Sequence, residues 1–181
     1  MNEVGKRFVQ TIRMERDAFV WMDFNDRATG DALILVVLGR FLLYVGFVGF
    51  GLRSLVNLDA LVLAASFMLQ GIVMWLLYSG ILYAILRFLL NKVASYALLL
   101  RITGFAYPTV LITLAVLTFV GVNSLTALLL VALVGAVWYI PIVARGLGYA
   151  VDVPFVTGVG VAAGAYVGYL VVARILGYPP I

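Results

Sequence analysis

The side chains that could do chemistry in this chain are few, and the most unusual of them is Arg40. It follows the apolar run "ALILVVLG" and precedes another that begins at Phe41. A charge so far inside an apolar helix is costly in lipid unless it reaches the head groups or is paired. Two interpretations stay open. The guanidinium reaches back to the membrane surface, or it faces inward and pairs with a carbonyl, Asp31 or Asp152.

Two tyrosine–proline pairs mark a second candidate site. Tyr107 precedes Pro108 in one apolar run, and Tyr139 lies near Pro141 in a later one. Each proline frees a carbonyl and kinks or starts its helix, so the pairs together predict a small cleft near the cytoplasmic ends of two helices. Two cations would stand at its rim, Arg101 and Arg145. The alternative is that the tyrosines belong to an interfacial aromatic belt.

The residue inventory argues against an enzyme. The chain has no histidine and no cysteine, so the commonest general base, metal ligand and thiol nucleophile are missing. The string "GVGVAAG" has the glycines of a nucleotide loop, but it lies within an apolar run and no strand precedes it. We expect no catalytic residue, no metal site and no cofactor.

Three glycines of that region repeat every four residues: Gly160, Gly164 and Gly168. They share one face of a helix, and such a face lets another helix approach closely. We expect it to pack within the same chain, with a homo-oligomer contact as the alternative.

The composition indicates whether these residues lie in a soluble protein or in a membrane protein. Of the 181 residues, 65% are hydrophobic and 11% are charged, and the mean hydropathy is +1.17. Soluble domains carry about 25% charged residues, so the chain is expected to be an integral membrane protein. Its net charge of +4 comes from cations spread along span boundaries, so we expect no nucleic-acid partner.

Five apolar runs are long enough to cross a bilayer, which takes about 20 residues. They cover residues 32–52, 61–86, 102–122, 125–144 and 154–173. Before them, residues 2–24 predict a helix with Val4, Phe8 and Ile12 on its apolar face. The sequence therefore predicts an all-α bundle of five transmembrane helices over residues 31–181. Residues 1–30 would form a cytoplasmic amphipathic surface helix and a polar turn.

The cations orient this bundle. Five precede the first span, three lie between the second and third, and one lies between the fourth and fifth, which places nine of the twelve on one side. The positive-inside rule then puts the amino terminus in the cytoplasm and the carboxyl terminus outside, in a prokaryotic plasma membrane. The short connection Gly121–Ser124 predicts that spans three and four are antiparallel neighbours.

The segment Leu77–Pro108 shows a particular order of features. A long span ends in a basic residue, and a short turn, a Ser-Tyr pair, an arginine and a glycine- and proline-bearing start of the next span follow. These are Arg87, Asn91-Lys92, Ser95-Tyr96, Arg101 and Gly104–Pro108. The order resembles the prokaryotic branch of the Yip (Ypt/Rab-interacting protein) membrane family. The segment "RMERDAFVWM" is similar to the family's segment before the first span, without its proline.

The resemblance implies a five-span protein with a cytoplasmic amino terminus and, from eukaryotic members, a role in membrane trafficking with small-GTPase partners. The Asp-Leu-Tyr-Gly-Pro-type motif of those members is missing here. Two functions stay open. The first is a non-enzymatic scaffold or adaptor of the Yip type, which engages a partner protein or anionic lipid on its cytoplasmic face. The second is a small permease or transporter subunit with an anion or lipid-head-group site near Arg40. The candidate binding residues are Arg40, Arg87, Lys92, Arg101, Tyr107, Pro108, Tyr139, Pro141 and Arg145.

Overall fold

Five helices of the computed structural model are long and apolar enough to cross a membrane. The structure describes residues 3–51, 58–114 and 125–177, and these form helices and no strand. The helices are α1 (Glu3–Ile12), α2 (Arg16–Phe24), α3 (Arg27–Gly51), α4 (Leu58–Ala84), α5 (Tyr96–Ala106), α7 (Leu125–Val151) and α8 (Phe155–Ile175). The prediction of an all-α chain with five helices of spanning length is confirmed. The predicted Gly121–Ser124 connection lies outside the described residues.

The amino-terminal region consists of two helices, so the prediction of one helix over residues 2–24 is wrong. The break falls between α1 and α2, where Met14 has a φ of 57°. A positive φ is incompatible with a continuous α-helix. Both helices pack against α5, and α2 also packs against α7. Val4 and Phe8 of the predicted apolar face lie against the core of the bundle.

The described spans differ from the predicted ones mainly at the end of the bundle where α1 and α2 lie. A π-helix, η1 (Ile85–Leu89), continues α4. The helix α5 begins six residues before the predicted start of the third span, and α7 ends seven residues after the predicted end of the fourth. The predicted boundaries at Ile102 and Ala144 are wrong because we placed Arg101 and Arg145 outside the helices. Both cations lie within them.

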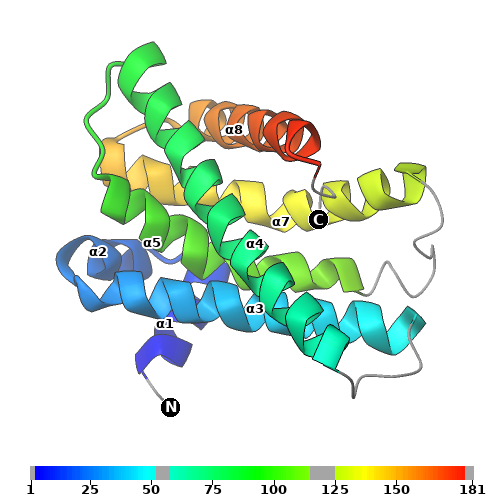
Figure 1. Ribbon diagram of the computed structural model, residues 1–181. Helices are drawn as coiled ribbons and strands as arrows, with labels where there is room; N and C mark the ends of the chain where they lie inside the picture. Colours follow the sequence, from blue (N-terminus) through cyan, green and yellow to red (C-terminus); the bar gives the residue numbers. More distant parts are fainter. Residues whose placement is uncertain (1–2, 52–57, 115–124, 178–181) are drawn as a thin grey trace.

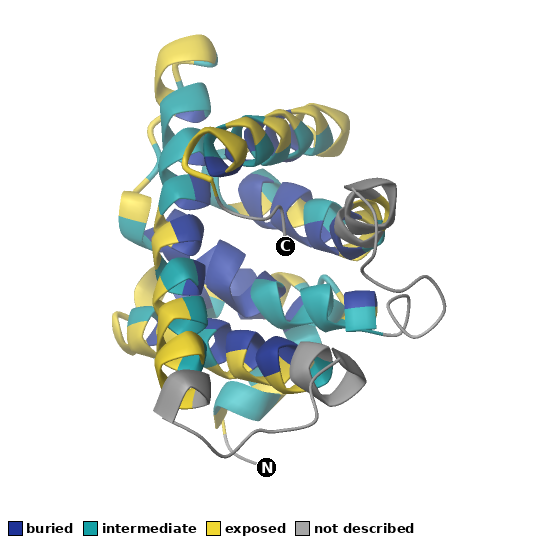
Figure 2. Ribbon diagram, turned by 45° about the vertical axis from the view of Figure 1, so that its right-hand side comes forward, coloured by how far each residue is buried: buried dark blue, intermediate teal, exposed yellow. Residues whose placement is uncertain are grey.

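The packing of the helices follows from these lengths. Figure 1 shows α4 crossing α3 and α5 at an angle, and α8 lying along α7. The closely packed pairs include α3 with α5, α7 with α8, and α4 with α3, α5 and α8. The buried residues face inward in Figure 2. A thick apolar core fills the half of the bundle nearer to α1 and α2, and its fully buried members include Leu82, Leu86, Leu99, Ile102, Phe105, Ile142 and Leu147.

Glycines bring two helix pairs close together. An added Cβ at Gly104 of α5 would come within 2.6 Å of the Ala32 side chain of α3. At Gly158 of α8 it would come within 2.8 Å of the Ala144 carbonyl oxygen of α7. Neither position has room for a side chain, so both glycines are needed for these helix contacts.

The glycine face that we predicted is different. A Cβ at Gly160 or Gly164 would meet no atom within 4 Å, and both residues are exposed. A Cβ at Gly168 would lie 3.5 Å from Ile81. The prediction that these glycines pack within the chain is therefore wrong for Gly160 and Gly164, which point away from the bundle. Periodicity identified a shared face, but it could not tell which way that face points.

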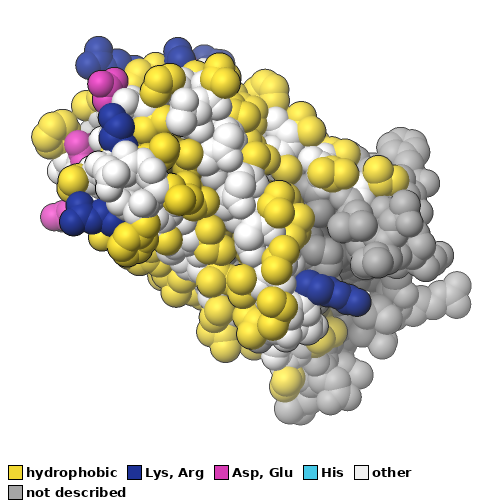
Figure 3. All heavy atoms as spheres, turned by 90° about the horizontal axis from the view of Figure 1, so that it is seen from above, with side chains coloured by type: hydrophobic (Ala, Val, Ile, Leu, Met, Phe, Trp, Pro, Cys, Tyr) yellow, Lys and Arg dark blue, Asp and Glu magenta, His cyan; other side chains and the backbone are white. Residues whose placement is uncertain are grey.

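Charged side chains are concentrated at one end of the molecule. Figure 3 shows Lys, Arg, Asp and Glu side chains gathered at one end of the face in view, with a broad apolar area beside them. A single cation stands near the other end of this face. A wide surface without charges is what a bilayer requires of the helices that face it.

Candidate functional site

Arg40 lies inside the bundle. The residue is 1% exposed. Its guanidinium carbon stands 4.8 Å from the ring centre of Phe67 and 6.0 Å from that of Tyr107. It also interacts with the phenol groups of Tyr107 and Tyr169. The inward-facing interpretation is therefore correct, and the contacts named above are with aromatic side chains.

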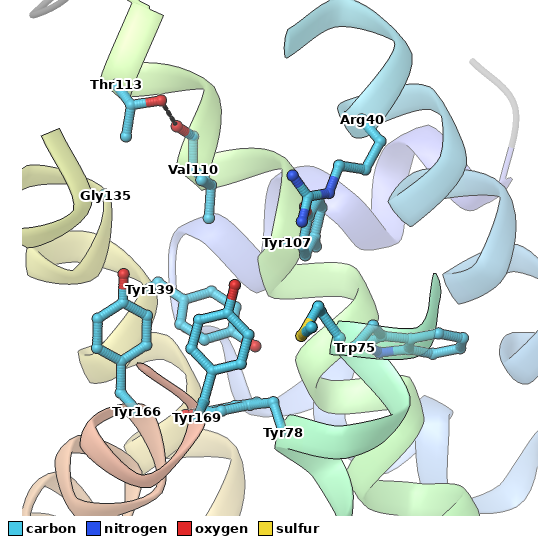
Figure 4. Close-up of a pocket in the computed structure, with 11 residues that line it drawn as sticks. Arg40, Trp75, Tyr78, Tyr107, Val110, Thr113, Gly135, Tyr139, Tyr166 and Tyr169 are labelled. Atoms are coloured by element: carbon cyan, nitrogen blue, oxygen red, sulfur yellow. Dashed lines mark hydrogen bonds between the residues drawn. The ribbon is translucent and has the colours of Figure 1, made fainter. Parts of the chain in front are cut away.

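Arg40 lies beside a cavity of about 50 Å³ whose wall comes from all five spans (Figure 4). Its lining residues are Arg40, Met74, Trp75, Tyr78, Tyr107, Val110, Thr113, Gly135, Tyr139, Tyr166 and Tyr169. Five of these are tyrosines and one is charged. The cavity therefore combines apolar ring surfaces with phenol groups and a single guanidinium.

Helical spacing explains how the side chains meet. Trp75 and Tyr78 are three residues apart on α4, and Tyr166 and Tyr169 are three apart on α8. Residues at this spacing share one helix face. After α5, the chain continues as a 3-10 helix, η2 (Tyr107–Leu111). Its shorter repeat of about three residues turns Tyr107 and Val110 to the same side.

The tyrosine rings hold one another in place. Tyr78 lies 5.4 Å from Tyr139 and 6.4 Å from Tyr169, and Tyr166 lies 5.7 Å from Tyr169, measured between ring centres. The Tyr78 hydroxyl donates to the carbonyl oxygen of Ala162 at 3.2 Å. Tilted and edge-on contacts of this kind are favourable beyond their buried area. The lining is thus a packed aromatic cluster.

Two other polar lining groups are occupied by structural hydrogen bonds. The Trp75 Nε1 donates to Thr103 Oγ1 at 2.9 Å, and that hydroxyl also pairs with Ser79 Oγ at 2.8 Å. Thr113 Oγ1 donates to the Val110 carbonyl oxygen at 2.7 Å. These bonds satisfy buried groups that would otherwise be costly. The other polar side chains of the lining are the Arg40 guanidinium and the phenol groups of the tyrosines.

The cavity lies deep in the bundle. Arg40 is 13 residues from the start of α3, Tyr139 is 12 from the end of α7, and Tyr169 is 14 from the start of α8. At 1.5 Å per residue, these positions are about 18–21 Å from the end of the bundle. The predicted cleft near the helix ends is therefore wrong in depth, because α5 and α7 extend further than expected.

The predicted residues Pro108 and Pro141 do not line the cavity. Pro108 stands at the start of η2, and Pro141 lies inside α7. Their neighbours Tyr107 and Tyr139 do line it. The prolines thus lie next to lining residues in the sequence but do not line the cavity themselves.

Arg101 is a structural residue, which corrects its expected place on a binding surface. Its Nε donates to Thr29 Oγ1 at 2.8 Å, its Nη1 to the Met22 carbonyl oxygen at 2.7 Å, and its Nη2 to Asp26 Oδ1 at 2.8 Å. A further contact reaches the Asp23 carbonyl oxygen at 3.3 Å. Arg101 is 6% exposed, so it ties α2 and the start of α3 to α5 and is closed to a partner.

The other predicted cations are spread over the charged end. Arg87 is exposed on η1, and the Lys92 ammonium donates to the Asp152 carbonyl oxygen at 3.3 Å. Arg145 is exposed, with its guanidinium 5.4 Å from the Tyr149 ring centre, beside a separate hollow of about 170 Å³. Of the nine predicted binding residues, the structure brings Arg40, Tyr107 and Tyr139 together.

Sequence reasoning missed most of the cavity wall. The predicted binding residues include neither Tyr166 and Tyr169 of α8 nor Trp75 and Tyr78 of α4. Their three-residue spacing was the signal that could have found them. Comparison with known proteins adds nothing here, since no family model, no curated protein and no solved structure matches the chain.

Proposed function

We propose that this protein binds an anionic group inside the membrane, as a small permease or transporter subunit. The observation that carries the proposal is the Arg40 guanidinium, buried among five spans and facing a tyrosine-lined cavity. A guanidinium stays charged in proteins, and an ionisable residue within a membrane usually marks the route or site of a substrate.

The surroundings of Arg40 support an anion in particular. The rings of Phe67 and Tyr107 offer cation–π contacts that lower the cost of burying the charge. An anion in the cavity would complement the charge directly. The neighbouring phenols would supply further hydrogen-bond donors to the same ligand. A site of this kind binds and orients its ligand, and we infer no catalytic step.

The proposed orientation follows the positive-inside rule. The charged end with α1 and α2 would face the cytoplasm, and the carboxyl terminus would lie outside a prokaryotic plasma membrane. The gathering of charges at one end in Figure 3 supports this orientation. The cavity would then be separated from the cytoplasm by the apolar core around Phe105 and Leu147.

Replacing Arg40 tests this function. Arg40→Leu removes the charge at the cavity, whereas Arg145→Leu removes an exposed arginine from outside it. We expect Arg40→Leu to abolish binding or uptake of anions by proteoliposomes, with the helical circular dichroism retained. Arg145→Leu should keep that activity. Equal anion binding by the wild type and the folded Arg40→Leu variant would contradict the proposal.

A second candidate is the Yip-type scaffold or adaptor, and the exposed side chains of η1 and of the link that follows it favour this candidate. Arg87 is exposed on η1, Phe88 beside it is 77% exposed, and Val93 of the link is 80% exposed. Exposed apolar and basic groups suit an interface with a partner or with anionic lipid. Affinity purification from native membranes tests this candidate. Recovery of the protein alone, as a monomer and without bound lipid, would contradict it.

A further inference from the structure

We propose that the ligand of the Arg40 cavity is a small, weakly hydrated anion of single charge, of the size of a halide or nitrate. This inference rests on the proposed anion site and names the class of its ligand. A guanidinium could also bind a doubly charged oxyanion or a phospholipid head group, and we infer that neither of these is the ligand.

The charge of the cavity wall argues for a single charge. Among the described residues of the lining, Arg40 is the only charged one, and the other polar groups are neutral phenols, one hydroxyl and one indole. A singly charged anion would make the site neutral. A dianion such as sulfate would leave one negative charge buried without a counter-ion, which is costly at low dielectric.

The size of the cavity argues against a head group. A cavity needs a volume of about 10–15 Å³ to hold one water molecule. The Arg40 cavity, with a volume of about 50 Å³, therefore has room for only a few atoms. A phosphodiester with its glycerol is much larger, and its acyl chains would have to leave between packed helices. An anion of one atom, such as a halide, or a planar anion of three or four atoms, such as nitrate, fits without such a rearrangement.

The donors converge where such an anion would sit. In Figure 4, Arg40 reaches from α3 toward the tyrosines of α8, and the hydroxyls of Tyr166 and Tyr169 point to the side on which the guanidinium lies. Tyr107 and Tyr169 interact with that guanidinium. A phenol oxygen that accepts from an arginine keeps its own O–H as a donor. Guanidinium and phenol donors can therefore bind one anion together.

The apolar rings favour a weakly hydrated ion. Most of the wall is aromatic or aliphatic, so an entering anion loses most of its water and recovers only a few hydrogen bonds. That exchange is least costly for anions such as iodide and nitrate, whose hydration is weak.

Trp75 provides a reporter for the experiment, because its indole lines the same cavity. The chain has two other tryptophans, Trp21 and Trp138, and the double variant Trp21→Phe/Trp138→Phe leaves Trp75 as the single tryptophan. The full chain would be placed in phosphatidylcholine nanodiscs and titrated with iodide, a fluorescence quencher. Nitrate, sulfate and inorganic phosphate would then be added as competitors, and nanodiscs with phosphatidylglycerol would present the head group.

We expect saturable quenching of Trp75 by iodide that nitrate relieves and that sulfate, phosphate and phosphatidylglycerol leave unchanged. Arg40→Gln should weaken iodide binding about 10- to 100-fold, the range for losing hydrogen bonds to a charged group. Arg145→Gln, outside the cavity, should leave it unchanged. If Arg40→Gln does not fold, Tyr169→Phe removes one phenol donor and should weaken binding about threefold to tenfold.

Two results would overturn the inference in distinguishable ways. If phosphate, sulfate or phosphatidylglycerol displaces iodide better than nitrate does, the ligand class is wrong and the anion site stands. If quenching is not saturable and is the same in Arg40→Gln or Tyr169→Phe as in the parent, the anion site fails together with the ligand class.

Discussion

At the scale of single residues, Arg40 fits inside the bundle because the helix that it meets carries a glycine, Gly71. A cation within an apolar run has a high cost in lipid wherever the helix lies. Whether it faces inward depends on Gly71 of α4, where an added Cβ would clash with the Cγ, Cδ and Nε atoms of Arg40. Such a contact between residues of two helices leaves no local pattern, so the burial of Arg40 could not be predicted.

Gly71→Ala should therefore disturb the site. The new methyl group would push the Arg40 side chain from its place, and we expect weaker anion binding and a lower melting temperature. Gly80→Ala, on the same helix, is the matched control, since a Cβ there meets no atom within 4 Å. That change should keep anion binding and leave or slightly raise stability, because alanine favours a helix over glycine. Full anion binding by Gly71→Ala would show that the glycine does not position Arg40.

Thr103→Val tests the hydrogen bonds behind the cavity. It removes the hydroxyl that accepts from Trp75 Nε1 and pairs with Ser79 Oγ. We expect a loss of about 1–3 kcal/mol, because buried polar groups lose a partner, and a shift in the Trp75 emission spectrum. Thr109→Val serves as the control, since the Thr109 hydroxyl bonds only locally, to the Ala106 carbonyl oxygen. An unchanged melting temperature in Thr103→Val would contradict the role of this network.

At the scale of the helices, hydropathy predicted the five helices of spanning length. The predicted ends next to Arg101 and Arg145 were wrong. We treated Arg101 and Arg145 as boundaries, because a charge usually ends a span. The structure instead lets Arg101 lie within α5, since carbonyl oxygens, a hydroxyl and a carboxylate satisfy its guanidinium. These partners come from residues 22–29, more than 70 positions away in the sequence. No local sequence pattern predicts them.

Arg101→Leu should loosen the amino-terminal helices. The variant loses the bonds that tie α2 and the start of α3 to α5, so we expect a melting temperature lower by about 5 °C or more. Limited proteolysis near Met14 should also become faster. Asp26→Asn is the comparison, because the Asp26 side chain is fully exposed and its charge is screened by solvent. Equal effects of the two changes would show that the ion pair, rather than the carbonyl contacts, holds these helices.

At the scale of the whole molecule, composition was enough to predict an all-α membrane bundle, because so few charges cannot cover a soluble surface. The tyrosine-lined cavity was not predictable in the same way. Its residues come from five helices whose mutual rotation is set by contacts such as Gly104 on Ala32. The sequence supplied tyrosines at helical spacing, but not the side of each helix that faces inward.

The orientation of the bundle can be tested with cysteine labelling, since the chain has no cysteine of its own. Glu3→Cys would report on the amino-terminal end and Arg174→Cys on the opposite end. In intact cells, we expect a membrane-impermeant maleimide to label Arg174→Cys and to label Glu3→Cys only after the membrane is permeabilised. The reverse pattern would contradict the orientation proposed from the positive-inside rule.

The most direct test of the central claim is a crystal structure of the protein soaked in iodide, with the anomalous signal used to locate the ion. We expect a peak in the tyrosine-lined cavity, within hydrogen-bond distance of the Arg40 guanidinium. We also expect that the peak disappears in Arg40→Leu. A cavity without iodide in the wild type, with Arg40 still buried and iodide bound elsewhere on the molecule, would contradict the claim that this cavity is an anion site.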